Sequence, residues 1–79
     1  MQLELFKRDT CPYCLKVMHY LEKTGRCDVT FTDISLSPED RARLTQLGGK
    51  PQVPCLVIDG EALYESDDII SWLEKHPQF

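Results

Sequence analysis

The chain has 79 residues, enough for one small domain and too few for a second with its own core. Its net charge of −4 argues against nucleic acid and anionic membranes as partners. No segment approaches the roughly 18 apolar residues of a membrane span, and the opening MQLELFKRDT lacks the pattern of a signal peptide. We therefore expect one monomeric domain over residues 1–79, located in the cytoplasm.

The first part of the chain predicts a strand, a helix and a second strand. Residues 3–6 alternate apolar and charged side chains, as short strands do, before a polar turn at 7–10. After Cys11, apolar residues follow the helical spacing i, i+3, i+4, i+7, and Gly25 is a natural helix end. This apolar stripe consists of Cys14, Val17, Met18 and Leu21. The alternating segment 29–34 predicts the second strand.

The middle of the chain predicts a second helix and a buried strand. Ser37 can cap the helix, Pro38 suits its first position, and Asp40 stands where a capping-box acid belongs. The helix should end at the Gly48–Gly49 pair. The nearly continuous apolar run 53–58 is typical of a strand that is buried on both faces.

The last part of the chain predicts a hairpin and a third helix. Asp59–Gly60 is a two-residue hairpin signal leading into the strand 61–64, and Ser66 should cap the final helix. The element order is therefore βαβαββα. A crossover connection pairs the first two strands in parallel, and the hairpin adds antiparallel strands, which gives an α/β domain.

Cys11 and Cys14 fall at the start of the first predicted helix. There, unpaired backbone N–H groups and the positive end of the helix dipole favour a thiolate at Cys11. Cys14 begins the inward stripe and should be sheltered. A readily ionised sulfur gains little as an attacking group, but it leaves more easily when a second thiol attacks its mixed disulfide. We predict that Cys11 is the nucleophile and Cys14 the resolving thiol.

Structural zinc is the main alternative for this cysteine pair, because C-x₂-C is half of a common tetrahedral site. Cys27 and Cys55 form no second such pair, and no two histidines have zinc-finger spacing. We therefore expect no metal. Cys55 is interpreted as a small core residue, with a regulatory thiol as the alternative, and Cys27 as an incidental thiol.

Three motifs in order resemble the glutaredoxins of the thioredoxin superfamily: C-P-Y-C after a first strand, V-P opening a later strand, and S-D-D at a helix start after a hairpin. The resemblance covers essentially the whole chain. It implies a thioredoxin fold, with a four-stranded mixed sheet and helices on both faces. It also implies a glutathione-dependent thiol-disulfide oxidoreductase that reduces protein disulfides and glutathione mixed disulfides, with glutathione as the reductant.

The resemblance further implies a glutathione site around the cysteine pair. Arg8 stands where the family usually has a lysine that supports the thiolate or the glycyl carboxylate of glutathione, and Tyr13 lines the groove. Val53 would offer backbone hydrogen bonds to the cysteinyl moiety, as an added strand does. Pro54 would be the family's cis-proline, facing the sulfurs.

The same resemblance places the γ-glutamyl end of glutathione at the start of the last helix. Ser66 and Asp67 would hold it through backbone N–H groups and polar side chains, although simple helix capping also explains both residues. Two positions depart from the family pattern. Gln52 replaces a common threonine, and Tyr64–Glu65 replaces a Gly-Gly pair, so the floor of this pocket should be bulkier.

Other functions remain as alternatives. The segment YESDDI also looks like the N-terminal domain of glutathione transferases, but the chain stops at Phe79 without their helical second domain. An iron–sulfur carrier would hold a [2Fe–2S] cluster between two chains through Cys11 and glutathione, which the proline after Cys11 disfavours. A thioredoxin-like electron donor would depend on a flavin reductase. Arg41 and Arg43 are interpreted as a solvated helix face, with attraction of anionic glutathione as the alternative.

Overall fold

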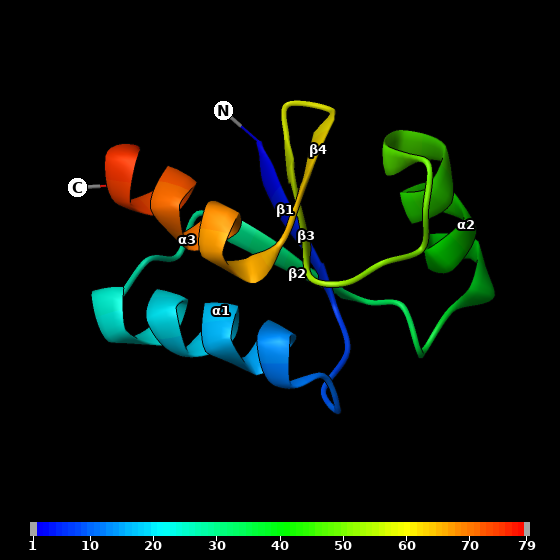
Figure 1. Ribbon diagram of the computed structural model, residues 1–79, viewed down its shortest axis with the longest axis horizontal. Coiled ribbons are helices and arrows are strands. Elements are labelled where there is room, and N and C mark those ends of the chain that lie inside the picture. The colour runs from blue at the N-terminus through cyan, green and yellow to red at the C-terminus, as the bar shows by residue number, and fades with distance from the viewer. Residues whose placement is uncertain (1, 79) are drawn as a thin grey trace.

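The computed structural model describes residues 2–78 and contains, within them, four strands and three helices (Figure 1). The elements are β1 (Leu3–Lys7), α1 (Pro12–Thr24), β2 (Val29–Asp33), α2 (Pro38–Gly48), β3 (Cys55–Ile58), β4 (Glu61–Tyr64) and α3 (Ser66–Lys75). The predicted order βαβαββα is confirmed. Over these residues, no helix has both the length and the apolar character that crossing a membrane requires.

The strands form one mixed sheet in the order β2-β1-β3-β4. β1 runs parallel to β2 and antiparallel to β3, and β4 pairs antiparallel with β3 at the other edge. The carboxyl ends of β1 and β2 therefore lie at the same end of the sheet. The chain leaves β1 at that end and enters α1 through the turn that contains Cys11 (Figure 1).

Helices cover both faces of the sheet, as predicted: α1 and α3 pack side by side on one face and α2 lies on the other (Figure 1). Each face has its own hydrophobic core. The larger core is formed by Leu3, Leu5, Val17, Leu21, Leu56, Ile69 and Leu73. The smaller core, under α2, is formed by Phe6, Ile34, Leu44, Cys55 and Val57. Cys55 is thus a core residue, fully shielded from solvent.

Local sequence signals explain the bounds of α1 and α2. Pro12 occupies the first turn of α1, and Gly25 ends the helix in the left-handed region at φ 71°, which glycine adopts without strain. In α2, the Ser37 side chain accepts a hydrogen bond from the backbone N–H of Asp40 at 3.4 Å. Both helices therefore begin and end where the sequence predicted.

Four boundaries differ from the prediction. β2 ends at Asp33 rather than at Ile34, and β3 begins at Cys55 rather than at Val53, because Pro54 has no N–H to contribute to a strand ladder.

Lys7 belongs to β1 rather than to the turn, because it pairs with Asp33 in the parallel ladder and its ammonium lies 3.6 Å from the Asp33 carboxylate. The prediction that Ser66 caps α3 is wrong: Ser66 is the first residue of the helix and is buried. Glu65 holds the cap position, with φ 72° and no side-chain capping bond.

Candidate functional site

Cys11 lies at the N-cap of α1, just beyond the carboxyl end of β1. Its Sγ accepts a hydrogen bond from the backbone N–H of Cys14 at 3.3 Å, and its thiol donates to the carbonyl of Val53 at 3.9 Å. The residue is only partly buried. The site therefore combines a solvent-accessible sulfur with a backbone donor and the positive end of a helix dipole, which together stabilise negative charge on that sulfur.

Cys14 is in the opposite environment, because it is the first inward residue of α1 and is fully shielded from solvent. Burial, followed by hydrogen bonding to Cys11, raises the pKa of the Cys14 thiol to about 12. At neutral pH this thiol is protonated. The two cysteines are both free thiols, so they form a dithiol with one outer and one inner sulfur.

A groove of about 300 Å³ opens beside the start of α1. It is lined by Tyr13, Gln52, Val53, Pro54, Glu65, Ser66 and Asp67. The Val53–Pro54 peptide bond is cis, as the family resemblance implied. Of the seven residues predicted to contact glutathione, all but Arg8 line this groove. Arg8 is exposed on the turn before α1, where its carbonyl accepts a hydrogen bond from the N–H of Cys11 at 3.3 Å.

The walls of the groove are joined by polar contacts between separate elements. The amide of Gln52, in the loop before β3, donates to the carboxylate of Glu65 at 3.2 Å. Lys16, on α1, forms an ion pair with Asp67, on α3. Lys16 was not predicted as a site residue, because its helical position indicates only a solvent-facing side chain. Its partner is 51 residues away in the sequence, so no local pattern could reveal the contact.

The first turn of α3 forms the far wall of the groove. The side chain of Glu65, the N-cap residue, accepts no hydrogen bond from the backbone N–H groups of this turn. Such groups, at the positive end of a helix, are suited to binding a carboxylate. The buried Ser66 and the exposed Asp67 stand at this position.

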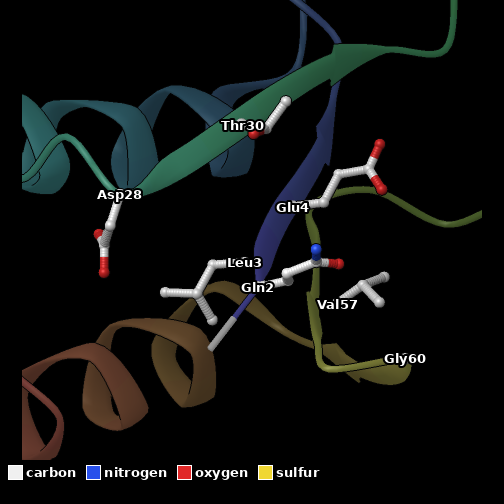
Figure 2. Close-up of a pocket in the computed structure, with 7 residues that line it drawn as sticks. All are labelled: Gln2, Leu3, Glu4, Asp28, Thr30, Val57 and Gly60. Carbon is white, nitrogen blue, oxygen red and sulfur yellow. The ribbon is translucent and has the colours of Figure 1, made fainter.

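Figure 2 shows a larger hollow, of about 440 Å³, at the amino-terminal end of β1. It is lined by Gln2, Leu3, Glu4, Asp28, Thr30, Val57 and Gly60. Both of its carboxylates already have partners, because Arg43 binds Glu4 and Arg26 binds Asp28. No cysteine lines it. The smaller groove, at the opposite end of β1, lies beside a cysteine, because the Cys11 thiol contacts the carbonyl of its lining residue Val53.

Two further cysteines, Cys55 and Cys27, are also free thiols. Burial raises the pKa of the Cys55 thiol to about 11. Cys27 is exposed just before β2, and its Sγ accepts a hydrogen bond from Gln78 at 3.4 Å. Over residues 2–78, the structure has no group of three or more histidine, cysteine, aspartate and glutamate side chains arranged to hold a metal ion.

The sequence matches the family model described as Glutaredoxin over residues 3–63. A search of curated proteins gave no match. Among solved structures, glutathione transferase Omega 3C from Trametes versicolor superposes with a TM-score of 0.81 at 23% identity, over 96% of this chain and 34% of that one. The present chain thus spans about a third of the length of that transferase.

Two further solved structures are similar in fold. The thioredoxin-like protein BC3987 gives a TM-score of 0.78 at 24% identity, over 94% of this chain and 97% of that one. The holo form of glutaredoxin C1 from Populus tremula x tremuloides gives a TM-score of 0.70 at 18% identity, over 92% and 74%. At these identities the likeness concerns the fold, and it confirms the predicted thioredoxin fold.

Proposed function

Because the chain belongs to the glutaredoxin family, we propose that it is a glutathione-dependent thiol-disulfide oxidoreductase that acts through Cys11 and Cys14. Family membership supports glutathione-linked thiol redox activity in general. The finer proposal rests on one observation, the inequivalence of the two sulfurs. Cys11 is accessible and accepts a backbone N–H at a helix start, whereas Cys14 is buried with a raised pKa.

In the first step, the Cys11 thiolate attacks the glutathione sulfur of a glutathionylated protein. A Cys11–glutathione disulfide forms, the original disulfide breaks, and the protein thiolate leaves and takes a proton from water. The Cys14 N–H and the helix dipole stabilise the attacking thiolate. They stabilise the same sulfur when it later leaves, which is the half of the cycle where a stable thiolate helps most.

The second step has two routes. A second glutathione thiolate attacks the bound glutathione sulfur, which releases oxidised glutathione and the Cys11 thiolate. Alternatively, the Cys14 sulfur attacks Cys11 after losing its proton, closes an intramolecular disulfide and releases glutathione. Part of the rise in the Cys14 pKa comes from the hydrogen bond and charge of Cys11. Once Cys11 is in a disulfide, its sulfur carries no charge and accepts hydrogen bonds more weakly, so Cys14 should ionise more easily at the stage that uses it.

The groove supports the proposal because it offers complementary groups for glutathione next to Cys11. In the proposed complex, the backbone of Val53 pairs with the cysteinyl moiety, and the amides at Ser66 and Asp67 receive the γ-glutamyl carboxylate. Tyr13, which is 66% exposed, forms the outer lip. Disulfide-containing and glutathionylated proteins are the proposed partners, and the cytoplasm, with its glutathione pool, is the compartment that fits.

The test compares single variants of the two cysteines on two substrates, a glutathionylated peptide and a protein that contains internal disulfides, such as insulin. Cys14→Ser should retain most deglutathionylation and lose most reduction of the protein disulfide, because only the second reaction requires an internal resolving thiol. Cys11→Ser should lose both activities. Both are measured as glutathione-dependent turnover, with Cys27→Ser as the matched control that retains both.

Two results would contradict the proposal. If Cys14→Ser lost both activities equally, the assigned roles of the two sulfurs would be wrong. If the wild-type protein processed neither substrate with glutathione but turned over with a flavin reductase, the electron donor would be wrong.

A further inference from the structure

Tyr64, the last residue of β4, connects three parts of the chain that meet behind the groove. Its hydroxyl donates a hydrogen bond of 2.8 Å to the carbonyl of Lys50, in the loop between α2 and β3. The Lys50 ammonium in turn lies 4.7 Å from the centre of the Tyr64 ring. In the sheet, Tyr64 pairs with Cys55, the residue after the cis-proline. The side chain of Tyr64 thus contacts Lys50 at the start of the 50–54 loop, and its backbone pairs with Cys55, the residue that follows the loop.

The end of α2 is shaped to accept this hydroxyl. A methyl group added at Gly48, the last residue of α2, would fall 1.9 Å from the Tyr64 hydroxyl oxygen and 2.6 Å from the ring carbon that carries it. Gly48 has a helical backbone, so glycine is not needed there for its conformation. It is needed for space. The hydroxyl therefore occupies a fixed position between the end of α2 and the loop.

The loop that Tyr64 holds carries one wall of the groove. Gln52, Val53 and Pro54 all line the groove, and the chain continues from Tyr64 directly into Glu65 and Ser66 of the opposite wall. Three side-chain hydrogen bonds hold this loop in place. The Tyr64 hydroxyl donates to the Lys50 carbonyl, and the Gln52 amide donates to the Glu65 carboxylate. The Cys11 thiol donates to the Val53 carbonyl. Losing one of these three contacts should loosen the backbone at Val53.

We propose that Tyr64 is a positioning residue for glutathione binding, which fixes the 50–54 loop through Lys50 and so keeps the Val53 backbone in its binding geometry. The inference rests on the proposed function for its ligand, and on the contacts above for its geometry. Tyr64 itself does not line the groove, so the expectation that it adds bulk to the pocket floor is wrong, whereas Glu65 does line the groove. If only a fraction of the molecules have the loop in the binding geometry, the apparent affinity for the ligand falls by that fraction. The reacting sulfur is unchanged.

The decisive variant is Tyr64→Phe, which keeps the ring, the strand pairing and the cation contact but removes the hydroxyl. The KM for a glutathionylated peptide should rise about two- to tenfold, as expected for one lost hydrogen bond, and kcat should stay within about twofold. Gly48→Ala should give the same split by displacing the hydroxyl from the other side. Tyr20→Phe, which removes a hydroxyl from α1 on the opposite face of the sheet, should change neither constant.

A second measurement does not depend on the ligand. Backbone ¹⁵N order parameters at Gln52 and Val53 in the free protein should fall in Tyr64→Phe and stay at wild-type values in Tyr20→Phe. Unchanged KM together with unchanged order parameters would overturn the inference, and so would a loss of kcat at constant KM. If the wild type itself failed to accept glutathionylated peptide, the proposed function would fail. The order parameters would then still decide whether Tyr64 positions the loop.

Discussion

The four cysteine side chains are chemically identical but differ in solvent exposure and in hydrogen bonding. Cys11 accepts a backbone N–H at a helix start, and Cys27 is exposed before an edge strand. Cys14 and Cys55 are fully shielded, and burial is the largest cause of their raised pKa values, about 12 and about 11. Because the thiolate is the reactive form, both burial and the raised pKa disfavour reaction at Cys14 and Cys55.

The reduced protein should therefore react with iodoacetamide at pH 8 first at Cys11 and Cys27. At that pH only about one in a thousand thiols with a pKa near 11 is ionised, so Cys55 should react far more slowly, and Cys14 more slowly still. Mass spectrometry of peptides from timed samples checks the order. All four should react in denaturant, and fast modification of Cys14 in the folded protein would contradict the assigned environments.

At the scale of elements, Arg43 joins α2 to the centre of the sheet. Its guanidinium donates to both carboxylate oxygens of Glu4, on β1, at 2.8 and 2.6 Å, and lies 4.8 Å from the centre of the Phe6 ring. The interpretation of Arg43 as part of a solvated helix face was therefore incomplete. Arg41, two residues earlier in the same helix, is exposed and fits the interpretation as part of a solvated helix face.

Arg43→Met should reduce the free energy of unfolding at pH 7 by about 1 kcal/mol, the scale of a well-aligned, partly exposed bidentate pair. The hydrogen bond to Arg43 is the main cause that lowers the pKa of Glu4 from its ordinary value of 4.5. A lowered carboxyl pKa stabilises the fold above the unfolded value, and this stabilisation is lost as the pH falls through the folded value. The difference between wild type and variant should thus shrink below about pH 4.5.

Urea unfolding at pH 7 and at pH 3 measures this difference, with Arg41→Met as the control on the same helix. The control should unfold like the wild type at both pH values. An equal loss of stability in both variants would indicate that helix propensity or net charge, rather than the Glu4 contact, is responsible.

At the scale of the whole molecule, the buried thiols make stability depend on alkaline pH. The unfolded chain releases thiol protons near the ordinary pKa of 9.0, whereas folded Cys55 retains its proton up to about pH 11. The folded state then binds more protons than the unfolded state, so the free energy of unfolding should fall as the pH rises above about 9. Cys55→Ala should make this fall shallower.

Thermal unfolding of reduced protein between pH 8 and 11 checks the slope. Cys27→Ala, which alters an exposed thiol, should follow the wild-type slope. A Cys55→Ala curve parallel to that of the wild type would show that the buried thiol does not contribute.

The element order was predictable because each element carries its own pattern: alternation in the strands, the apolar stripe of α1, and proline or glycine at helix ends. Local boundaries were less certain. Glu65, with its positive φ, occupies the N-cap position that was expected for Ser66. Phe31 is 48% exposed because β2 is an edge strand. The cysteine pair and most groove residues followed from motifs. The contacts of Lys16 and Tyr64 did not, because they join residues whose proximity depends on the complete fold.

The strand order also affects how the chain assembles during synthesis. β1, near the start of the chain, is a central strand, and its neighbours are β2 and β3. β3 ends at Ile58, so most of the chain must leave the ribosome before the first strand has both partners. Until then Leu5 and Phe6, which are fully buried in the folded protein, remain exposed to water or to a chaperone that binds the nascent chain.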